Sequence, residues 1–114
     1  MKIGIVGSRS FENYKFFKRK ILKHYDIVDI EEIISGGAIG TDTLAEKFAS
    51  EYSIPTTVYK PDWSLGKCAG ALRNKKIVDH SDIIIAFWDG KSKGTKITID
   101  MAIKENKHVR IIWI

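Results

Sequence analysis

The stretch SGGAIGTD at residues 35–42 carries the strongest local signal in this sequence. It places three of the chain's nine glycines directly after an apolar run that ends at Ile34, and directly before a helical pattern. A plain turn needs one glycine, whereas several between a strand and a helix let another group approach the backbone closely. The stretch therefore predicts a strand, a glycine-rich binding turn and a helix in succession.

The same alternation continues on both sides of this stretch, because short apolar runs and helical periodicity alternate from end to end. Strands are expected at 2–8, 31–35, 56–60, 82–88 and 108–114, and helices at 11–25, 42–52, 69–80 and 95–106. Ser10 is the expected N-cap of the first helix. Such a βα order predicts an α/β fold, a Rossmann-like three-layer sandwich over residues 1–114 as a single domain. Its five-stranded parallel sheet has the order 3-2-1-4-5, with helices on both faces.

Composition places the chain among ordinary globular domains. Its 114 residues are 44% hydrophobic and 29% charged, and the single cysteine, Cys68, excludes an internal disulfide. Neither a signal peptide nor an apolar run of membrane-spanning length is present, so a cytoplasmic protein without membrane contact is expected.

The formal net charge of +5 is concentrated in the first predicted helix. Five basic residues fall there within nine positions: Lys15, Lys18, Arg19, Lys20 and Lys23. The favoured interpretation is the solvated face of an amphipathic helix, and the alternative is a surface that binds a polyanion.

Turns rich in glycine, serine and threonine follow the first, second and fourth predicted strands. Because carboxyl ends of parallel strands share one edge of the sheet, we expect these turns to meet there and to direct backbone N–H groups at an anion. The turns supply Ser8, Arg9, Ser35, Gly36, Gly37, Gly40, Thr41, Gly94 and Thr95 as candidate phosphate ligands. Arg73 and Asn74, near the start of the third helix, are expected to orient ribose or phosphate.

Other familiar sites are disfavoured. A dinucleotide fingerprint would follow the first strand, but that position reads GSRSF, and the second strand ends in Ser35 rather than an acidic residue. No P-loop and no cluster of metal ligands is apparent, so no cofactor and no metal is expected. Asp89, at the end of the fourth strand, is a candidate for binding a hydroxyl or a cation. Asp42 is expected to cap or charge the start of the second helix.

Four segments together resemble the YspA-like branch of the SLOG superfamily, which is related to DNA-processing protein A and to the Lonely Guy phosphoribohydrolases. The segments are GSRSF (7–11), SGGAIGTD (35–42), PDWSLGKCAGALRN (61–74) and AFWDGKSKGT (86–95). The resemblance implies a Rossmann-like domain with a nucleotide-derived ligand in the glycine-lined crevice.

Resemblance to the Lonely Guy enzymes is incomplete. Arg73 matches their arginine, and Gly94 and Thr95 match part of their PGGxGTxxE loop, but Thr98 stands where their catalytic glutamate would be. The catalytic residues are therefore left open, with Arg73 and Asp89 as candidates. Asp42 is a further carboxyl that could replace the missing acid.

Three functions follow as hypotheses. The first is a nucleotide-binding sensor or binding module without demonstrated catalysis. The second is an enzyme that hydrolyses nucleoside 5′-phosphates at the N-glycosidic bond. The third is a single-stranded nucleic-acid binder that uses the lysine-rich helix. A homodimer is expected because Phe16 and Phe17 cannot both face one core.

Overall fold

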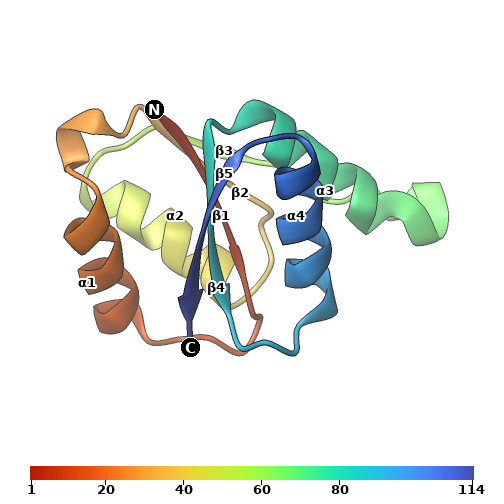
Figure 1. Cartoon of the computed structure of the whole chain (residues 1–114), viewed down its shortest axis with the longest axis horizontal. Helices are drawn as coiled ribbons and strands as arrows, with labels where there is room; N and C mark the ends of the chain where they lie inside the picture. Colours follow the sequence, from red (N-terminus) through yellow and green to blue (C-terminus); the bar gives the residue numbers. More distant parts are fainter.

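The computed structural model describes residues 1–114 as one sheet covered by helices on both sides (Figure 1). The strands are β1 (Lys2–Gly7), β2 (Glu32–Ser35), β3 (Thr56–Val58), β4 (Ile83–Trp88) and β5 (His108–Trp113). The α-helices are α1 (Tyr14–His24), α2 (Thr41–Glu51), α3 (Ala69–His80) and α4 (Lys93–Lys104). Two short 3-10 segments, η1 (Ile27–Asp29) and η2 (Trp63–Cys68), complete the chain.

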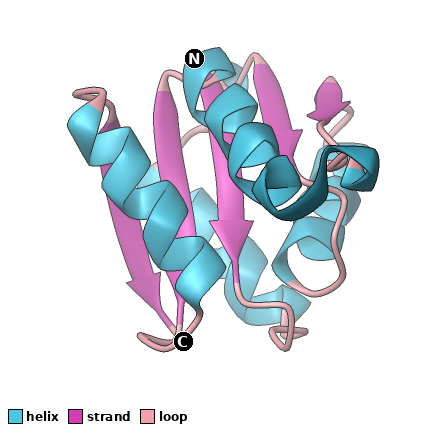
Figure 2. Ribbon diagram, turned by 90° about the vertical axis from the view of Figure 1, so that its right-hand side faces the viewer, coloured by secondary structure: helices cyan, strands magenta, loops and turns pink.

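All neighbouring strands are parallel, and their order is β3-β2-β1-β4-β5. This confirms the predicted Rossmann-like sheet. Helices α1 and α2 cover one face while α3 and α4 cover the other, as Figure 2 shows with α3 and α4 nearest the viewer. The connections from β1 and β4 run toward opposite edges of the sheet, and such a switch point is where ligands bind in folds of this kind.

The alternation of side chains along the strands divides the core into two layers. Ile3 and Ile5 of β1 join Phe17 and Phe48 beneath α1 and α2, whereas Val6 joins the layer beneath α3 and α4. Residues 84–87 of β4 are fully buried, as expected for a central strand covered on both faces. These two layers hold the carboxyl ends of β1, β2 and β4 rigidly side by side.

The start of the first helix differs from the prediction. The helix begins at Tyr14, and its N-cap is Asn13, whose Oδ1 accepts a hydrogen bond from the Phe16 N–H at 3.1 Å. Ser10 therefore does not cap α1, although both residue types suit that position. The turn after β1 is three residues longer than the periodicity suggested, and that extra length leaves Ser10 exposed at the sheet edge.

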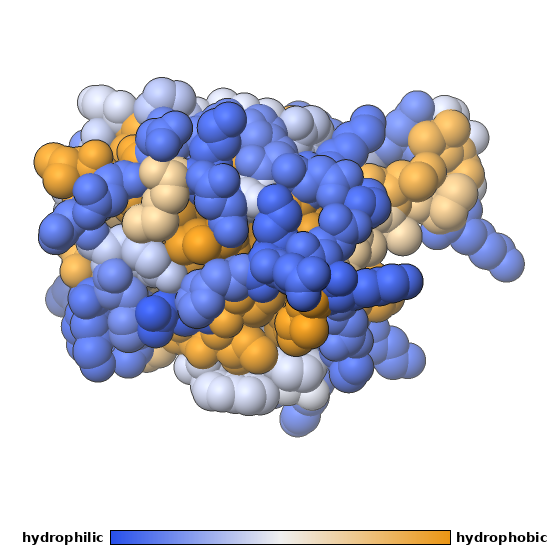
Figure 3. Space-filling model, turned by 45° about the horizontal axis from the view of Figure 1, so that its top comes forward, coloured by the Kyte–Doolittle hydropathy of each residue, from blue (hydrophilic) through white to orange (hydrophobic).

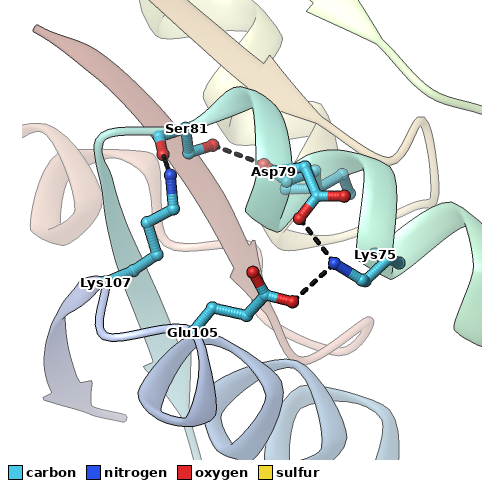
Figure 4. Close-up of polar contacts among 6 residues, drawn as sticks. Lys75, Asp79, Ser81, Glu105 and Lys107 are labelled. Carbon is cyan, nitrogen blue, oxygen red and sulfur yellow. Dashed lines mark hydrogen bonds and ion pairs between the residues drawn. The ribbon is translucent and has the colours of Figure 1, made fainter.

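At the amino end of the sheet, α3 and α4 are joined by polar contacts (Figure 4). The Lys75 ammonium lies 2.7 Å from Asp79 Oδ1 and 2.5 Å from Glu105 Oε1. The Lys107 ammonium donates to the Ser81 carbonyl at 2.8 Å. These contacts join the segments after α3 and α4 at the end of the sheet opposite the binding edge.

No helix has both the length and the apolar character needed to cross a membrane. The segment containing η2 projects from the body at the right of Figure 1 and carries apolar surface in Figure 3. Its exposed apolar side chains are Trp63 and Leu65.

Candidate functional site

A cleft of about 460 Å³ opens at the carboxyl ends of the strands. Its walls come from the turns after β1, β2 and β4 and from the first half of α3. The three turns therefore meet at one edge, as the sequence predicted. Among the predicted residues, the cleft is lined by Ser8, Arg9, Gly36, Asp42, Arg73, Asn74, Asp89, Gly94 and Thr95.

Arg73 is the best-fixed cation of the cleft. Its Nη1 donates to the Gly36 carbonyl at 2.6 Å, and its Nε donates to Asn74 Oδ1 at 2.8 Å. Its partial burial lowers the pKa of Arg73, and the nearby Asp42 carboxylate opposes this effect. A guanidinium held by its Nη1 and Nε still presents its remaining N–H groups in a planar fork, which suits phosphate oxygens.

Several hydrogen-bond donors of the cleft have no partner within the protein. The Ser8 hydroxyl is buried, with 3% of the residue exposed, and has no partner at full hydrogen-bond geometry, although it lies close enough to the Asp89 carboxylate to help lower the pKa of that group. The backbone N–H groups of Arg9 and Gly94 likewise make no hydrogen bond. Buried polar groups are nearly always paired in folded proteins, so a lining of unpaired donors indicates a place for an acceptor-rich ligand.

The N-terminus of α4 closes one wall of the cleft. Ser92 is its N-cap and shares hydrogen bonds with Thr95, whose Oγ1 lies 3.0 Å from Ser92 Oγ. The Trp88 indole N–H donates to the Ser92 carbonyl at 3.1 Å and so fixes the turn before the helix. Gly94 sits in the first turn with open space where a Cβ would stand. This end of the helix carries a partial positive charge that favours an anion.

The two carboxyls of the cleft differ in electrostatic environment. Burial raises the pKa of Asp42 to about 6, although the Ala38 N–H donates to its Oδ2 at 3.1 Å and Arg73 lies nearby. The exposed Asp89 has a lowered pKa, because the N–H groups of Lys91 and Ser92 donate to its Oδ1 at 2.8 and 2.9 Å. Burial therefore favours the protonated form of Asp42, whereas backbone hydrogen bonds favour the anion of Asp89.

Four of the predicted ligands, Ser35, Gly37, Gly40 and Thr41, do not line the cleft. Thr41 is fully buried, and both its N–H and its hydroxyl donate to the Ser8 carbonyl, at 3.2 and 2.9 Å. Gly40 adopts a φ of 77°, and a Cβ there would lie 2.2 Å from the Arg9 carbonyl oxygen. Ser35 is fully buried at the end of β2. Gly40 and Thr41 therefore support the turns that form the cleft, whereas the Ser35 hydroxyl has no hydrogen-bond partner and lies outside the cleft lining.

Gly37 faces a neighbouring hollow of about 600 Å³ that also includes Lys60, Pro61 and Trp63. Arg9, Gly36 and Arg73 line both this hollow and the main cleft. Lys60 was not anticipated, because its position at the end of a predicted strand gave no sign of where it would lie.

Thr98 also lines the cleft, at the position where the Lonely Guy pattern has a glutamate. It is buried, and its hydroxyl donates to the Gly94 carbonyl at 3.2 Å. Thr98 therefore stabilises the first turn of α4 and offers no acid. The candidate carboxyls left in the cleft are Asp42 and Asp89. No group of three or more potential metal ligands is found.

The lysine-rich face of α1 makes local contacts outside the cleft. Lys18 lies 3.1 Å from Glu51 Oε2, and the cationic groups of Arg19 and Lys20 lie 5.5 and 5.4 Å from the Phe16 ring centre. None of these side chains lines the cleft.

Comparisons with known proteins agree with this architecture. A family model described as DNA recombination-mediator protein A matches residues 1–61. DNA processing protein A from Streptococcus pneumoniae has a TM-score of 0.79 at 20% identity, over 96% of this chain and 49% of that chain. DNA processing protein A from Helicobacter pylori, described with its single-stranded DNA binding mode, has a TM-score of 0.75 at 21% identity, over 97% and 64%. TM1055, a structural genomics target, has a TM-score of 0.67 at 17% identity, over 95% and 71%.

The chain thus spans about half the length of the Streptococcus pneumoniae protein and less than two thirds of the Helicobacter pylori protein. At these identities the structural matches show a common fold. No curated protein sequence matches the chain significantly.

Proposed function

Because this chain belongs to the DNA recombination-mediator protein A family, within the SLOG superfamily that its motifs resemble, we propose that its cleft binds the phosphate of a nucleotide. The observation that carries the proposal is the buried, unpartnered Ser8 hydroxyl in a cleft that also contains Arg73 and the N-terminus of α4. A phosphate accepts hydrogen bonds from all three kinds of donor at once.

The positions of the donors support a division of roles. The Ser8 hydroxyl and the N–H groups of Arg9 and Gly94 bind phosphate oxygens, and the Arg9 and Arg73 guanidinium groups balance their charge. Asn74, whose Oδ1 accepts from Arg73, orients the ribose or the guanidinium itself. Gly40 and Thr41 act indirectly by holding the turn after β1.

Calorimetric titration with AMP, GMP, CMP, UMP, ADP-ribose and NAD tests this function. We expect at least one nucleotide to bind, and Ser8→Ala to weaken its binding about tenfold, the worth of one hydrogen bond to a charged group. Ser50→Ala, at an exposed position of α2, serves as the matched control and should bind normally. Unchanged affinity in Ser8→Ala would show that the phosphate lies elsewhere.

Chromatography of each bound nucleotide tests the enzymatic alternative. Release of free base and sugar phosphate would make the protein an N-glycosidic hydrolase despite Thr98. Asp42 is then the group we assign to acid–base chemistry, since its pKa is about 6 whereas Asp89 stays ionised. In that case Asp42→Asn abolishes product release. Recovery of intact nucleotide supports a binding module.

Single-stranded DNA is the second candidate ligand, favoured by the family match and by the binding mode named for the Helicobacter pylori protein. A polyanion that contacts several cations loses affinity steeply as salt increases, whereas a mononucleotide loses little. A steep salt slope for oligo(dT), lost in the double variant Lys18→Glu and Lys20→Glu, would assign DNA binding to α1. A slope lost in Arg9→Ala would assign it to the cleft.

Two expectations about the whole protein also remain proposals. A cytoplasmic location agrees with a nucleotide ligand, and a homodimer would cover part of the exposed apolar surface. Light scattering after size exclusion measures the mass and decides the second point.

A further inference from the structure

The two edges of the sheet differ in how well they are protected. The edge strand β3 has only three residues; Pro55 directly precedes it and Pro61 follows shortly after it. The opposite edge strand, β5, has six residues with the sequence HVRIIW, which contains no proline, glycine or lysine. Short strands, prolines and lysines are the usual means by which proteins prevent a sheet edge from pairing. The β3 edge is therefore protected, and the β5 edge is not.

The outer edge of β5 lies open at the surface. Figure 1 views the sheet edge-on, with β5 in front of the other strands and the helices to either side of it. Within the chain β5 pairs with β4 alone. Such an edge presents a row of unpaired backbone N–H and C=O groups, which is a template for another strand.

One hydrogen bond identifies the residues of β5 whose backbone faces outward. The Ile114 N–H donates to the Trp88 carbonyl at 3.1 Å, so the N–H of Ile114 points toward β4. Successive residues of a strand direct their backbone groups to opposite sides, so those of Val109, Ile111 and Trp113 point away from β4. These three residues are the ones that can exchange hydrogen bonds with a further strand.

The same three residues carry apolar side chains on the α3/α4 face of the sheet. Val109 and Ile111 pack against the core layer beneath these helices, and Trp113 stacks on Trp88 of that layer with ring centres 5.3 Å apart. Even so, 62% of Trp113 is exposed. A strand added at this edge would cover part of its ring, so apolar contact would accompany the backbone pairing.

Arg110 is the one residue of β5 that is always charged, and it is held within its own chain. Its Nε donates to the Tyr25 hydroxyl at 3.1 Å, and its guanidinium lies 5.6 Å from the centre of the Tyr25 ring. Tyr25 caps the C-terminus of α1, so the charge is held on the α1 side of the sheet and is not free to guard the edge.

Symmetry and charge select the register in which two copies of β5 fit together. A two-fold axis normal to the sheet makes the two strands antiparallel and places one residue opposite itself. An axis at Arg110 would set two guanidinium groups opposite each other, which is unfavourable. An axis at Ile111 sets Ile111 opposite Ile111 and Val109 opposite Trp113, so every outward-facing residue lies in a hydrogen-bonded pair. Arg110 then stands opposite Ile112 of the second copy.

We propose that the protein forms a homodimer in which the β5 edges of two copies pair antiparallel about Ile111 and join the two sheets into one. This inference goes beyond nucleotide binding: it identifies the interface of the homodimer and does not depend on what the cleft binds. Because the paired strands run in opposite directions, the two clefts lie at opposite ends of the joined sheet.

Two charge variants at the axis test the pairing. Light scattering after size exclusion should give the wild type twice the 12.9 kDa mass of one chain, and should give Ile111→Lys and Ile111→Glu the mass of one chain, because each variant sets like charges opposite each other. A mixture of the two variants should regain the double mass, since lysine then stands opposite glutamate. Val28→Lys, which removes an exposed apolar side chain in η1, is the control and should remain dimeric.

Three results would overturn the proposal. The first is a monomeric wild type. The second is a dimer that persists in both Ile111 variants, which would place the interface on another face of the protein. The third is a mixture that stays monomeric although circular dichroism shows both variants to be folded. None of these results bears on nucleotide binding in the cleft.

Cysteine cross-linking tests the register without adding charge at the axis. The exposed thiol of Cys68 is first removed by Cys68→Ser. In that background Ile111→Cys should give a disulfide-linked dimer on mild oxidation, because Cα atoms of a hydrogen-bonded antiparallel pair lie about 5.5 Å apart, within the reach of a disulfide. Arg110→Cys is the matched control and should stay uncross-linked, since position 110 faces position 112 of the second copy. Cross-linking at position 110 in preference to 111, or at neither position, would overturn the proposed pairing.

Discussion

The Arg73 guanidinium and the Asp42 carboxylate approach the same face of Gly36. A Cβ at Gly36 would lie 2.5 Å from Arg73 Nη1 and 3.0 Å from Asp42 Oδ2. Any side chain larger than hydrogen would therefore push the guanidinium out of its contact with the Gly36 carbonyl. The glycine is needed here for space, so that a cation and a titratable acid can sit together under the cleft.

Gly36→Ala should weaken nucleotide binding at least tenfold, because Arg73 loses its position. The crowded Cβ should also lower the free energy of unfolding by about 1–3 kcal/mol. Gly70→Ala is the matched control: Gly70 lies in α3 with nothing within 4 Å of its Cβ position, so alanine should stabilise the helix slightly. Urea unfolding and calorimetry measure both effects. Equal affinities in the two variants would remove Arg73 from the proposed site.

Gly94→Ala separates binding from stability. A methyl group at Gly94 meets nothing within 4 Å in the free protein and replaces glycine in a helix, so stability should stay constant or rise by up to about 1 kcal/mol. If phosphate sits against the Gly94 N–H, the same methyl group obstructs it and affinity falls. Normal affinity for AMP in a fully folded Gly94→Ala protein would contradict phosphate binding at the N-terminus of α4.

Ser8→Ala should increase the stability of the ligand-free protein and lower its affinity for nucleotide. The buried hydroxyl has no partner, and leaving such a group unpaired costs about 1–3 kcal/mol. Removing it should therefore raise the melting temperature of the ligand-free protein. A drop in melting temperature would mean that the hydroxyl already has a partner in solution, and the proposal that it awaits a phosphate would lose its main support.

The free energy of unfolding should fall as the pH rises through about 6, because Asp42 loses its proton in the folded protein. The pKa of Asp42 is about 6 in the folded protein and 3.8 in the unfolded chain, so folding favours the protonated carboxyl. The resulting contribution to the free energy of unfolding is fully present below pH 3.8 and is lost as the pH rises through about 6. A difference of about two pH units corresponds to about 3 kcal/mol at most. Asp42→Asn should therefore be more stable than the wild type at pH 7.5, with the difference disappearing near pH 4. Urea unfolding at both pH values measures it, and a difference that does not change with pH would contradict the raised pKa.

A polar network around Glu32 and His80 should have the opposite pH dependence, because its contribution to stability is lost as the pH falls. Glu32 Oε1 lies 2.9 Å from His80 Nε2, its Oε2 accepts from Thr57, and the Tyr59 hydroxyl lies 2.8 Å from His80 Nδ1. The Thr57 hydrogen bond is the main cause that lowers the pKa of Glu32, so this contribution is present above about 4.5 and lost as pH falls through the lower folded value.

Glu32→Gln should accordingly cost about 1 kcal/mol at pH 7 and progressively less as the pH falls below 4. Glu12→Gln, at an exposed position before α1, should cost nothing at either pH. Thermal unfolding at several pH values compares the two. A loss in Glu32→Gln that is the same at pH 7 and pH 3 would show that the network does not depend on the ionised carboxylate.

The sequence alone was sufficient to predict the fold and the edge at which the cleft lies. Strand and helix identity follow from local periodicity, and the alternation of β and α segments restricts the connections to a parallel sheet. Since carboxyl ends of parallel strands share one edge, the turns bearing Ser8, Gly36 and Gly94 had to meet. The cap of α1 was mispredicted because Ser10 and Asn13 are equally suited to it, and only the path of the turn distinguishes them.

The tertiary structure decided what each residue does at that edge. Gly36 and Gly40 look alike in sequence, but Gly36 makes room for Arg73 and Asp42 whereas Gly40 packs against the backbone of Arg9. The pKa of Asp42 depends on burial, which no local pattern encodes. A hollow beside the cleft joins Phe11 to Ile114, at opposite ends of the chain, so it exists only once β5 lies beside β4. Local propensities set the elements, but burial, contact and charge come from packing between segments far apart in sequence.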